Sequence, residues 1–336
     1  MQKLVVSFSI IVISLVSGYV FNATIIKGLV RINMASAETM RRGMQKIALL
    51  VVNPVAFCSA VWVIDLSERR YFILPVIGIA ALATGLGLGF FGSRLQRLPP
   101  GRAGVYVTCA SFTNIGNIGG LFVFLLLGES AFALIPFYKL FEELWYYSIL
   151  FPLARSYGAR SSPGLTGVKA NSGMPAGALR VLRDPFLLVA LCAVALGLGL
   201  NAGGIARPVF FGRLNSALVP LSSFLLLFAI GMRMRFRIAR PDRLAAFLLI
   251  LGKALVAPAI VTVLAVFAGL NETAGGLGLK VVLVLSAMPV GFLGLVPPAL
   301  YNLDQDFAGS LWLASNAALL LIVPALFILL PGVTGS

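Results

Sequence analysis

The chain has 336 residues, of which 60% are hydrophobic and only 11% charged, and it carries a net charge of +15. A soluble domain has about 25% charged residues, so these charges are too few to cover a water-facing surface of this size. The basic residues stand in short clusters between apolar runs, as in the cytoplasmic loops of membrane proteins, and form no basic face for nucleic acid. The composition therefore predicts an integral protein of the lipid bilayer with no nucleic-acid partner.

The residues that most enzyme chemistry needs are missing. There is no histidine, which removes the commonest general base and the commonest metal ligand. Cys58, Cys109 and Cys192 are far apart, each in or beside an apolar run, and this spacing fits neither a zinc site nor a disulfide framework. No paired intramembrane aspartates and no phosphate-binding loop occur. We therefore expect no enzymatic activity, no metal and no cofactor.

Ten apolar runs have the length of a membrane-spanning helix. About 30 Å of hydrocarbon at 1.5 Å per residue requires about 20 residues, and the runs are too long and too continuously apolar for barrel strands. The first run could also be a signal peptide, but its length and the symmetry of the spans favour a retained helix. The predicted fold is all-α, with spans at roughly 4–25, 46–65, 71–92, 103–127, 130–153, 185–202, 215–232, 244–270, 277–300 and 307–331.

The distribution of Lys and Arg among the loops predicts the orientation. If the N-terminus is outside, the inner loops carry far more basic residues than the outer ones, including the cluster Arg233, Arg235, Arg237, Arg240 and Arg243. Because cytoplasmic loops collect such residues, we expect a multi-pass protein of the cell inner (plasma) membrane. Both termini would lie outside, in the periplasm if the membrane is bacterial.

The longest joint, 154–184, is rich in Arg, Ser, Gly and Pro and is predicted to be a cytoplasmic linker. It separates two halves of five spans, 1–153 and 185–336. Spans two and seven each contain a proline, Pro54 and Pro220, and spans four and nine resemble each other. Because each half has an odd number of spans, the two halves must be inverted relative to each other. The residues shared at a constant offset are Ser111 with Ser286, Gly116 with Gly291, Gly119 with Gly294, and Phe132-Ala133 with Phe307-Ala308.

Spans four and nine both contain helix-breaking residues at mid-membrane. Hydrocarbon cannot satisfy the backbone groups that a break frees, so a break persists only where it is buried or lines a watery cavity. Matched breaks in inverted repeats point to the substrate site of a secondary transporter. Close helix packing is the alternative, and it is the better explanation for Gly85, Gly87, Gly89, Gly197 and Gly199. The expected substrate-binding residues are Asn114, Gly116, Asn117, Gly119, Pro289 and Gly291.

Four ionisable residues within the predicted spans are candidate charge partners. Lys139 can pair with Glu142 or Glu143, which stand three and four residues later on one helix face. Such intramembrane residues are functional candidates, although a self-neutralised pair near the membrane boundary is an equal alternative. Lys253 has no acidic neighbour in the sequence. It could attract an anionic substrate, but we expect it to snorkel toward the inner loop.

Four stretches together carry a family resemblance: Phe112-Thr113-Asn114-Ile115-Gly116-Asn117-Ile118-Gly119, Ala287-Met288-Pro289-Val290-Gly291, Asp184-Pro185, and Leu225-Leu226-Leu227-Phe228-Ala229-Ile230-Gly231-Met232. In these stretches the chain resembles the auxin efflux carrier-type permeases. The resemblance implies ten helices in two inverted five-helix repeats, with helices four and nine broken and crossing near the substrate site. It also implies an organic anion as substrate. The family's span-four motif usually has a proline after its second glycine, where this chain has Gly120.

The predicted function is a secondary transporter that moves a small organic anion, such as a carboxylate, by alternating access, with export implied by the resemblance. The membrane potential or an ion gradient would supply the energy, with a proton or sodium as the coupling ion. The alternative is a sodium-coupled importer of the bile acid symporter type, in which Thr113, Asn114 and Asn117 would supply oxygen ligands. The sequence leaves the oligomeric state open, a homodimer included.

Overall fold

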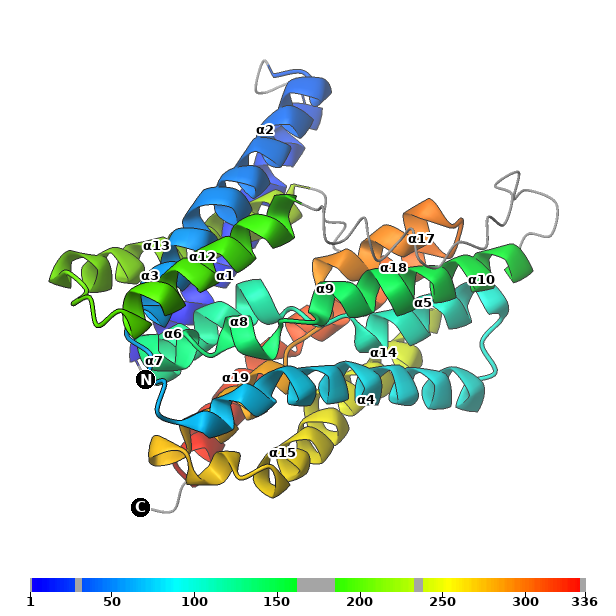
Figure 1. The fold of residues 1–336 in the computed structure, drawn as a ribbon. Helices are drawn as coiled ribbons and strands as arrows, with labels where there is room; N and C mark the ends of the chain where they lie inside the picture. Colours follow the sequence, from blue (N-terminus) through cyan, green and yellow to red (C-terminus); the bar gives the residue numbers. More distant parts are fainter. Residues whose placement is uncertain (1, 28–31, 162–184, 233–237, 333–336) are drawn as a thin grey trace. The chain divides into compact units, whose positions relative to one another are not determined.

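The computed structural model describes residues 2–27, 32–161, 185–232 and 238–332. In this part of the chain all regular secondary structure is helical (Figure 1), which confirms the predicted all-α fold. The chain divides into two compact units. Unit 1 comprises Met1–Arg69, Gly116–Pro136 and Asp184–Arg235, and unit 2 comprises Arg70–Ile115, Phe137–Arg183 and Phe236–Ser336.

The two units differ from the predicted halves 1–153 and 185–336, because each unit takes segments from both halves. The division of the chain into inverted repeats therefore stays a prediction. The first part of the predicted linker 154–184 belongs to α10 (Phe151–Ser161). The rest of that linker, 162–184, lies outside the described residues.

Unit 1 contains two pairs of packed helices. α1 (Gln2–Ile26) packs against α13 (Val209–Gly231), and α12 (Pro185–Ala202) packs against α3 (Asn53–Val61). In the first pair a Cβ atom on Gly18 would collide with the Phe228 carbonyl oxygen, and one on Gly231 with the Leu15 carbonyl oxygen. Small residues allow such close approach. The other helices of unit 1 are α2 (Met34–Ile47), η1 (Ala48–Val52), α6 (Gly120–Leu127) and α7 (Glu129–Phe132).

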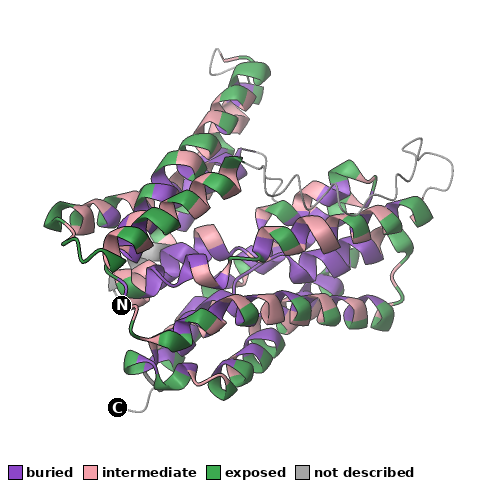
Figure 2. Ribbon diagram, viewed as in Figure 1, coloured by how far each residue is buried: buried purple, intermediate pink, exposed green. Residues whose placement is uncertain are grey.

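In unit 2, α4 (Leu74–Leu95) packs against α5 (Pro100–Ser111) and α15 (Ala257–Phe267). All residues of α5 from Ala103 to Ser111 are buried. In α4 and α15 exposed residues alternate with buried ones (Figure 2), and the large apolar residues Phe91 and Phe267 are exposed. The other helices of unit 2 are α9 (Glu142–Trp145), η4 (Tyr146–Leu150), α10, η5 (Arg240–Asp242), α14 (Arg243–Leu251), η6 (Gly252–Val256), η7 (Leu270–Glu272), η8 (Ala274–Gly276), α16 (Leu277–Ser286), η9 (Phe292–Leu295), α17 (Val296–Leu300), α18 (Gln305–Ala317) and α19 (Leu319–Gly332). Three short helices include residues of both units: η2 (Arg69–Ile73), η3 (Ile115–Gly119) and α8 (Ile135–Tyr138).

Among the described residues, eight helical segments are long and apolar enough to cross a membrane. Each corresponds to one of the ten predicted spans, which supports a multi-pass membrane protein. The predicted spans 130–153 and 277–300 are not continuous helices, so the count of ten and the inverted architecture stay predictions. The eight segments are Phe8–Ile26, Met34–Val61, Arg69–Leu95, Pro100–Leu127, Pro185–Ala202, Val209–Gly231, Arg240–Phe267 and Gln305–Leu330.

Each of the two interrupted spans contains a proline at or beside the interruption. In the predicted span 130–153, turns separate α7, α8 and α9, and Pro136 removes one backbone donor there. In the predicted span 277–300 the helix stops after Ser286 and resumes at Phe292, and Pro289 cannot donate the hydrogen bond that a continuous helix would need. Apolar length predicted 130–153 as one helix, because composition does not register a missing donor, whereas the break in 277–300 is the one predicted for span nine.

Three helices widen to a π-helix shortly before a proline. η1, η4 and η6 end two residues before Pro54, Pro152 and Pro258. Proline has no N–H group, and its ring pushes against the carbonyl group four residues earlier. A π-helical turn has i→i+5 hydrogen bonds and therefore contains one residue more than an α-helical turn. Such turns are frequent at functional sites. Lys253 lies in one of them, η6.

The glycines expected to serve helix packing lie on different helix faces, and only some of them contact a neighbouring helix. A Cβ atom on Gly85 or Gly89 would press against α5, and one on Gly197 against the Cys58 carbonyl, so the packing prediction is confirmed for these three. It is wrong for Gly87 and Gly199, whose Cβ atoms would meet nothing within 4 Å. Positions two residues apart lie on different faces of a helix, and only one face contacts the neighbour.

Candidate functional site

Residues 112–114 interrupt span four inside unit 2. α5 ends at Ser111, and Phe112 is extended, with φ −62° and ψ 124°. In a continuous helix the Asn114 N–H would donate to the Ala110 carbonyl four residues earlier. It donates instead to the Pro289 carbonyl oxygen, at 2.9 Å. The Ala110 carbonyl is therefore free to accept from another donor.

Residues 287–291 form the break in span nine. The Gly291 N–H donates to the Phe112 carbonyl oxygen at 3.3 Å, so two backbone hydrogen bonds join the two breaks. A Cβ atom on Gly291 would lie 2.8 Å from the Thr113 carbonyl oxygen, which explains why glycine stands there. The expected site residues Asn114, Pro289 and Gly291 are thus brought together, although they are far apart in the sequence.

Helix α18 supplies two polar side chains that bond to the break in span nine. The Val290 N–H donates to the Ser315 hydroxyl oxygen at 3.2 Å, and the Asn316 side-chain amide donates to the Val290 carbonyl oxygen at 3.4 Å. Both polar side chains are buried. They satisfy backbone groups that the missing helix leaves without partners. The sequence analysis missed them, although two adjacent polar residues within an apolar span were a visible signal.

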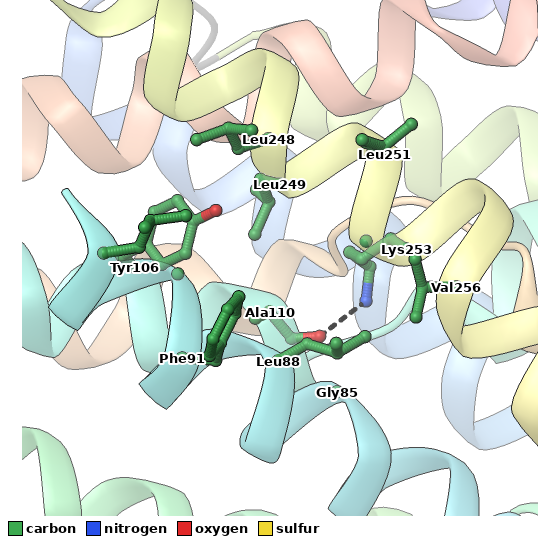
Figure 3. Close-up of a pocket in the computed structure, with 13 residues that line it drawn as sticks. Gly85, Leu88, Phe91, Tyr106, Ala110, Leu248, Leu249, Leu251, Lys253 and Val256 are labelled. Atoms are coloured by element: carbon green, nitrogen blue, oxygen red, sulfur yellow. Dashed lines mark hydrogen bonds between the residues drawn. The ribbon is translucent and has the colours of Figure 1, made fainter.

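Lys253 reaches the first break from η6. Its ammonium donates to the Ala110 carbonyl oxygen at 3.0 Å, the Phe112 carbonyl oxygen at 3.1 Å and the Thr113 hydroxyl oxygen at 3.0 Å. Figure 3 shows the side chain pointing toward Ala110. The residue is 6% exposed, so the prediction that it snorkels toward the inner loop is wrong. The C-terminal end of α5 attracts a cation because its carbonyl dipoles point there.

Glu142, on the fifth predicted span, is connected to the break in span four through Tyr146. Lys139 forms the expected ion pair with Glu142, at 3.4 Å. The Tyr146 hydroxyl donates to Glu142 Oε1 at 2.7 Å and accepts from the Thr113 N–H at 3.2 Å. Tyr146, which the sequence analysis did not single out, therefore links the carboxylate to the break. Glu143 is half-buried, and its charge also acts on Lys139.

Gly116, Asn117 and Gly119 belong to unit 1, where they form most of the π-helix η3. Asn117 and Gly116 are half-buried and Gly119 is buried. The Ser223 hydroxyl of α13 donates to the Asn117 carbonyl oxygen at 3.4 Å. The break of span four is thus followed at once by a second irregular turn, as expected for a segment that does not pack as an ordinary helix.

Two cavities lie beside Lys253 within unit 2. The larger, of about 150 Å³, is mostly apolar and lies between α4, α5 and α14, with Lys253 at one end (Figure 3). The smaller, of about 10 Å³, is lined by Ala110, Thr113, Tyr138, Lys253 and Ser286 among others. The smaller volume is about that of one water molecule.

A second polar network, in unit 1, was not expected from the sequence. The Arg207 guanidinium pairs with both carboxylate oxygens of Glu129 and donates to the Ser59 carbonyl oxygen at 2.9 Å. The Asn215 amide donates to Glu129 Oε1 at 2.6 Å and to the Ala56 carbonyl oxygen at 3.2 Å. Asn215 is the first residue of the predicted apolar span 215–232, and a polar residue at this position was the signal that could have revealed the network.

The comparison with protein-family models found no match, and the comparison with curated proteins found none either. The resemblance to the auxin efflux carrier-type permeases therefore rests on the four stretches of sequence alone and stays a prediction.

Proposed function

We propose that the protein is a secondary transporter of the inner membrane that moves a small organic anion, such as a carboxylate, by alternating access. One observation carries the proposal. Two interrupted apolar helices of unit 2 meet through backbone hydrogen bonds between Asn114 and Pro289 and between Gly291 and Phe112. A protein that only had to span the bilayer would have no need for such a pair of breaks.

The cost of unsatisfied backbone groups makes the paired breaks significant. In hydrocarbon each such group costs several kcal/mol, so non-helical backbone is tolerated only inside protein or beside a watery cavity. Here buried side chains, among them Lys253 and Ser315, bond to the backbone at the breaks. Discontinuous helices supported in this way form the substrate and ion sites of secondary transporters.

The charge of Lys253 favours an anionic solute. Lys253 has no ion pair with a carboxylate among those that the structure describes, and carbonyl and hydroxyl oxygens are its hydrogen-bond partners. Its charge therefore adds positive potential at the break, where the low dielectric strengthens electrostatic attraction. The resemblance to permeases of organic anions points to the same class of substrate and to export.

The first test is a thermal-shift screen of the purified protein with malate, malonate, succinate, indole-acetate and cholate, each with and without sodium. A ligand at about 100 times its dissociation constant stabilises a protein by about 2.7 kcal/mol. We expect one carboxylate to raise the melting temperature. If only neutral solutes or cations do so, the organic-anion proposal is wrong.

The second test measures flux of the stabilising anion in proteoliposomes. Asn114→Ala keeps the backbone hydrogen bond to Pro289 but removes the buried amide, and Gly291→Leu forces the breaks apart. The matched controls are Asn22→Ala in α1 and Gly87→Leu in α4, where a Cβ meets nothing within 4 Å. We expect flux to fall in both break variants and to persist in the controls. Unchanged flux in a folded Asn114→Ala and a folded Gly291→Leu would contradict the proposal.

A further inference from the structure

We propose that three oxygens at the C-terminal end of α5 form a site for a monovalent cation, and that the ammonium of Lys253 occupies this site as a tethered cation. The oxygens are the carbonyl oxygens of Ala110 and Phe112 and the hydroxyl oxygen of Thr113. This proposal concerns cation binding, and only its consequence for coupling rests on the proposed function.

The geometry around Lys253 is that of a bound ion. An ammonium group has three N–H donors and no acceptor, and three oxygens accept from it at 3.0, 3.1 and 3.0 Å. Because every donor is used, Lys253 cannot also bind a substrate carboxylate directly without giving up one of these bonds. Its role is therefore different from that of an anion-binding lysine.

The oxygens are available because the helix is broken. The Asn114 N–H, which would otherwise bond to the Ala110 carbonyl, donates to Pro289 instead. The end of α5 also carries the negative end of the helix dipole. In transporters with interrupted helices, unwound carbonyls and helix C-terminal ends coordinate sodium ions or protons. Lys253 places a side-chain cation at this kind of position.

In the described part of the chain, the groups that face Lys253 do not include a carboxylate in contact with it. Cys109 and Tyr106 come from α5, Tyr138 comes from α8, and both cavities beside Lys253 are lined by such neutral groups. The nearest acidic connection passes from Thr113 through Tyr146 to Glu142. A site whose ligands are neutral oxygens matches one positive charge, which is why we infer a monovalent cation.

This arrangement predicts which cation is coupled to transport. While Lys253 is protonated, a sodium ion has no room at the three oxygens, so the native protein should be independent of sodium. The proton of Lys253 would then serve as the coupling ion, in place of the sodium ion of a sodium-coupled importer. The cavity of about 10 Å³ beside Thr113 and Lys253 would join the space left by a shortened side chain. A small cation with water could then enter.

The experiment compares melting temperatures of the purified protein in NaCl and in choline chloride at equal ionic strength. At mildly acidic pH, where Lys253 keeps its proton, the wild type should show no difference between the salts. Lys253→Ala should melt lower in choline chloride and recover in NaCl, with a shift that saturates as the sodium concentration rises. Lys253→Ala combined with Thr113→Val, which removes one oxygen, should need at least about tenfold more sodium for the same shift. Lys139→Ala is the matched control, because Lys139 pairs with a carboxylate, and it should gain no sodium dependence.

A folded Lys253→Ala variant without a saturable sodium shift would overturn the proposal, as would a wild type that already shows the same shift at mildly acidic pH. If Lys253→Ala folds in neither salt, the wild type decides the question at alkaline pH. A sodium shift must then appear as the pH is raised and Lys253 loses its proton, and its absence overturns the proposal. No step of this test measures transport. A sodium shift without flux of any carboxylate would therefore support the cation site and contradict the proposed transport of an organic anion.

Discussion

The backbone N–H of Asn114 donates to the carbonyl oxygen of Pro289 across 2.9 Å. This bond takes the donor that would have continued α5, and it leaves the Ala110 carbonyl to Lys253. A single diverted hydrogen bond thus connects two apolar helices and creates an acceptor for a buried cation. The following predictions test the contacts around this bond and the wider organisation of the chain.

Gly291→Ala should destabilise unit 2 and lower flux. The added Cβ would lie 2.8 Å from the Thr113 carbonyl oxygen, and overpacking of this kind typically costs about 1–3 kcal/mol. The melting temperature in detergent measures the effect. Gly87→Ala is the control, because its Cβ enters open space and alanine favours a helix over glycine by up to about 1 kcal/mol. Equal melting temperatures for the two variants would show that the breaks do not touch.

Tyr146→Phe and Glu142→Gln should show coupled effects on stability. The Tyr146 hydroxyl bonds to both Glu142 and Thr113 in a buried setting, and an unsatisfied buried polar group costs about 1–3 kcal/mol. We expect each single variant to melt lower than the wild type, and the double variant to lose less than the sum. A double-mutant cycle on the melting temperature tests this, and strict additivity would mean that the hydroxyl and the carboxylate act independently.

Arg207→Gln should destabilise unit 1, where Arg207 pairs with Glu129 through both carboxylate oxygens. The two side chains are 13% and 23% exposed, so the pair is partly shielded from water and removal of one partner leaves the other charge uncompensated. We expect a larger loss for Arg207→Gln than for Arg42→Gln, because Arg42 is mostly exposed where it pairs with Glu38. Similar melting temperatures for these two variants would argue against a structural role for the network.

Surface labelling should establish the orientation. In a background without the three native cysteines, Ser67→Cys lies in a predicted outer loop and Arg160→Cys at the predicted inner end of α10, and both positions are exposed. Because basic residues collect on the cytoplasmic side, a membrane-impermeant maleimide should label Ser67→Cys in intact cells and Arg160→Cys only after permeabilisation. The reverse pattern would place the termini inside.

Much of the site could be anticipated because helix-breaking chemistry is local. Asn114, Pro289 and Gly291 were chosen for their residue types and matched spacing, and the structure brings them into contact. The direction of Lys253 could not be anticipated, since it depends on the π-turn of η6 and on carbonyls far away in the sequence. The same holds for Tyr146 and Ser315, whose partners lie on other helices.

The sequence by itself determined the class of the protein: an all-helical chain with many apolar spans and two points where a helix cannot continue. Bilayer thickness and the missing proline donor act within one segment, so composition and spacing reveal them. Only the tertiary structure decided that the two breaks join, that Lys253 faces Ala110 and not the inner loop, and that the predicted span 130–153 is not a single helix. These outcomes depend on which donor meets which acceptor across the fold, because a buried polar group takes the partner that packing brings to it.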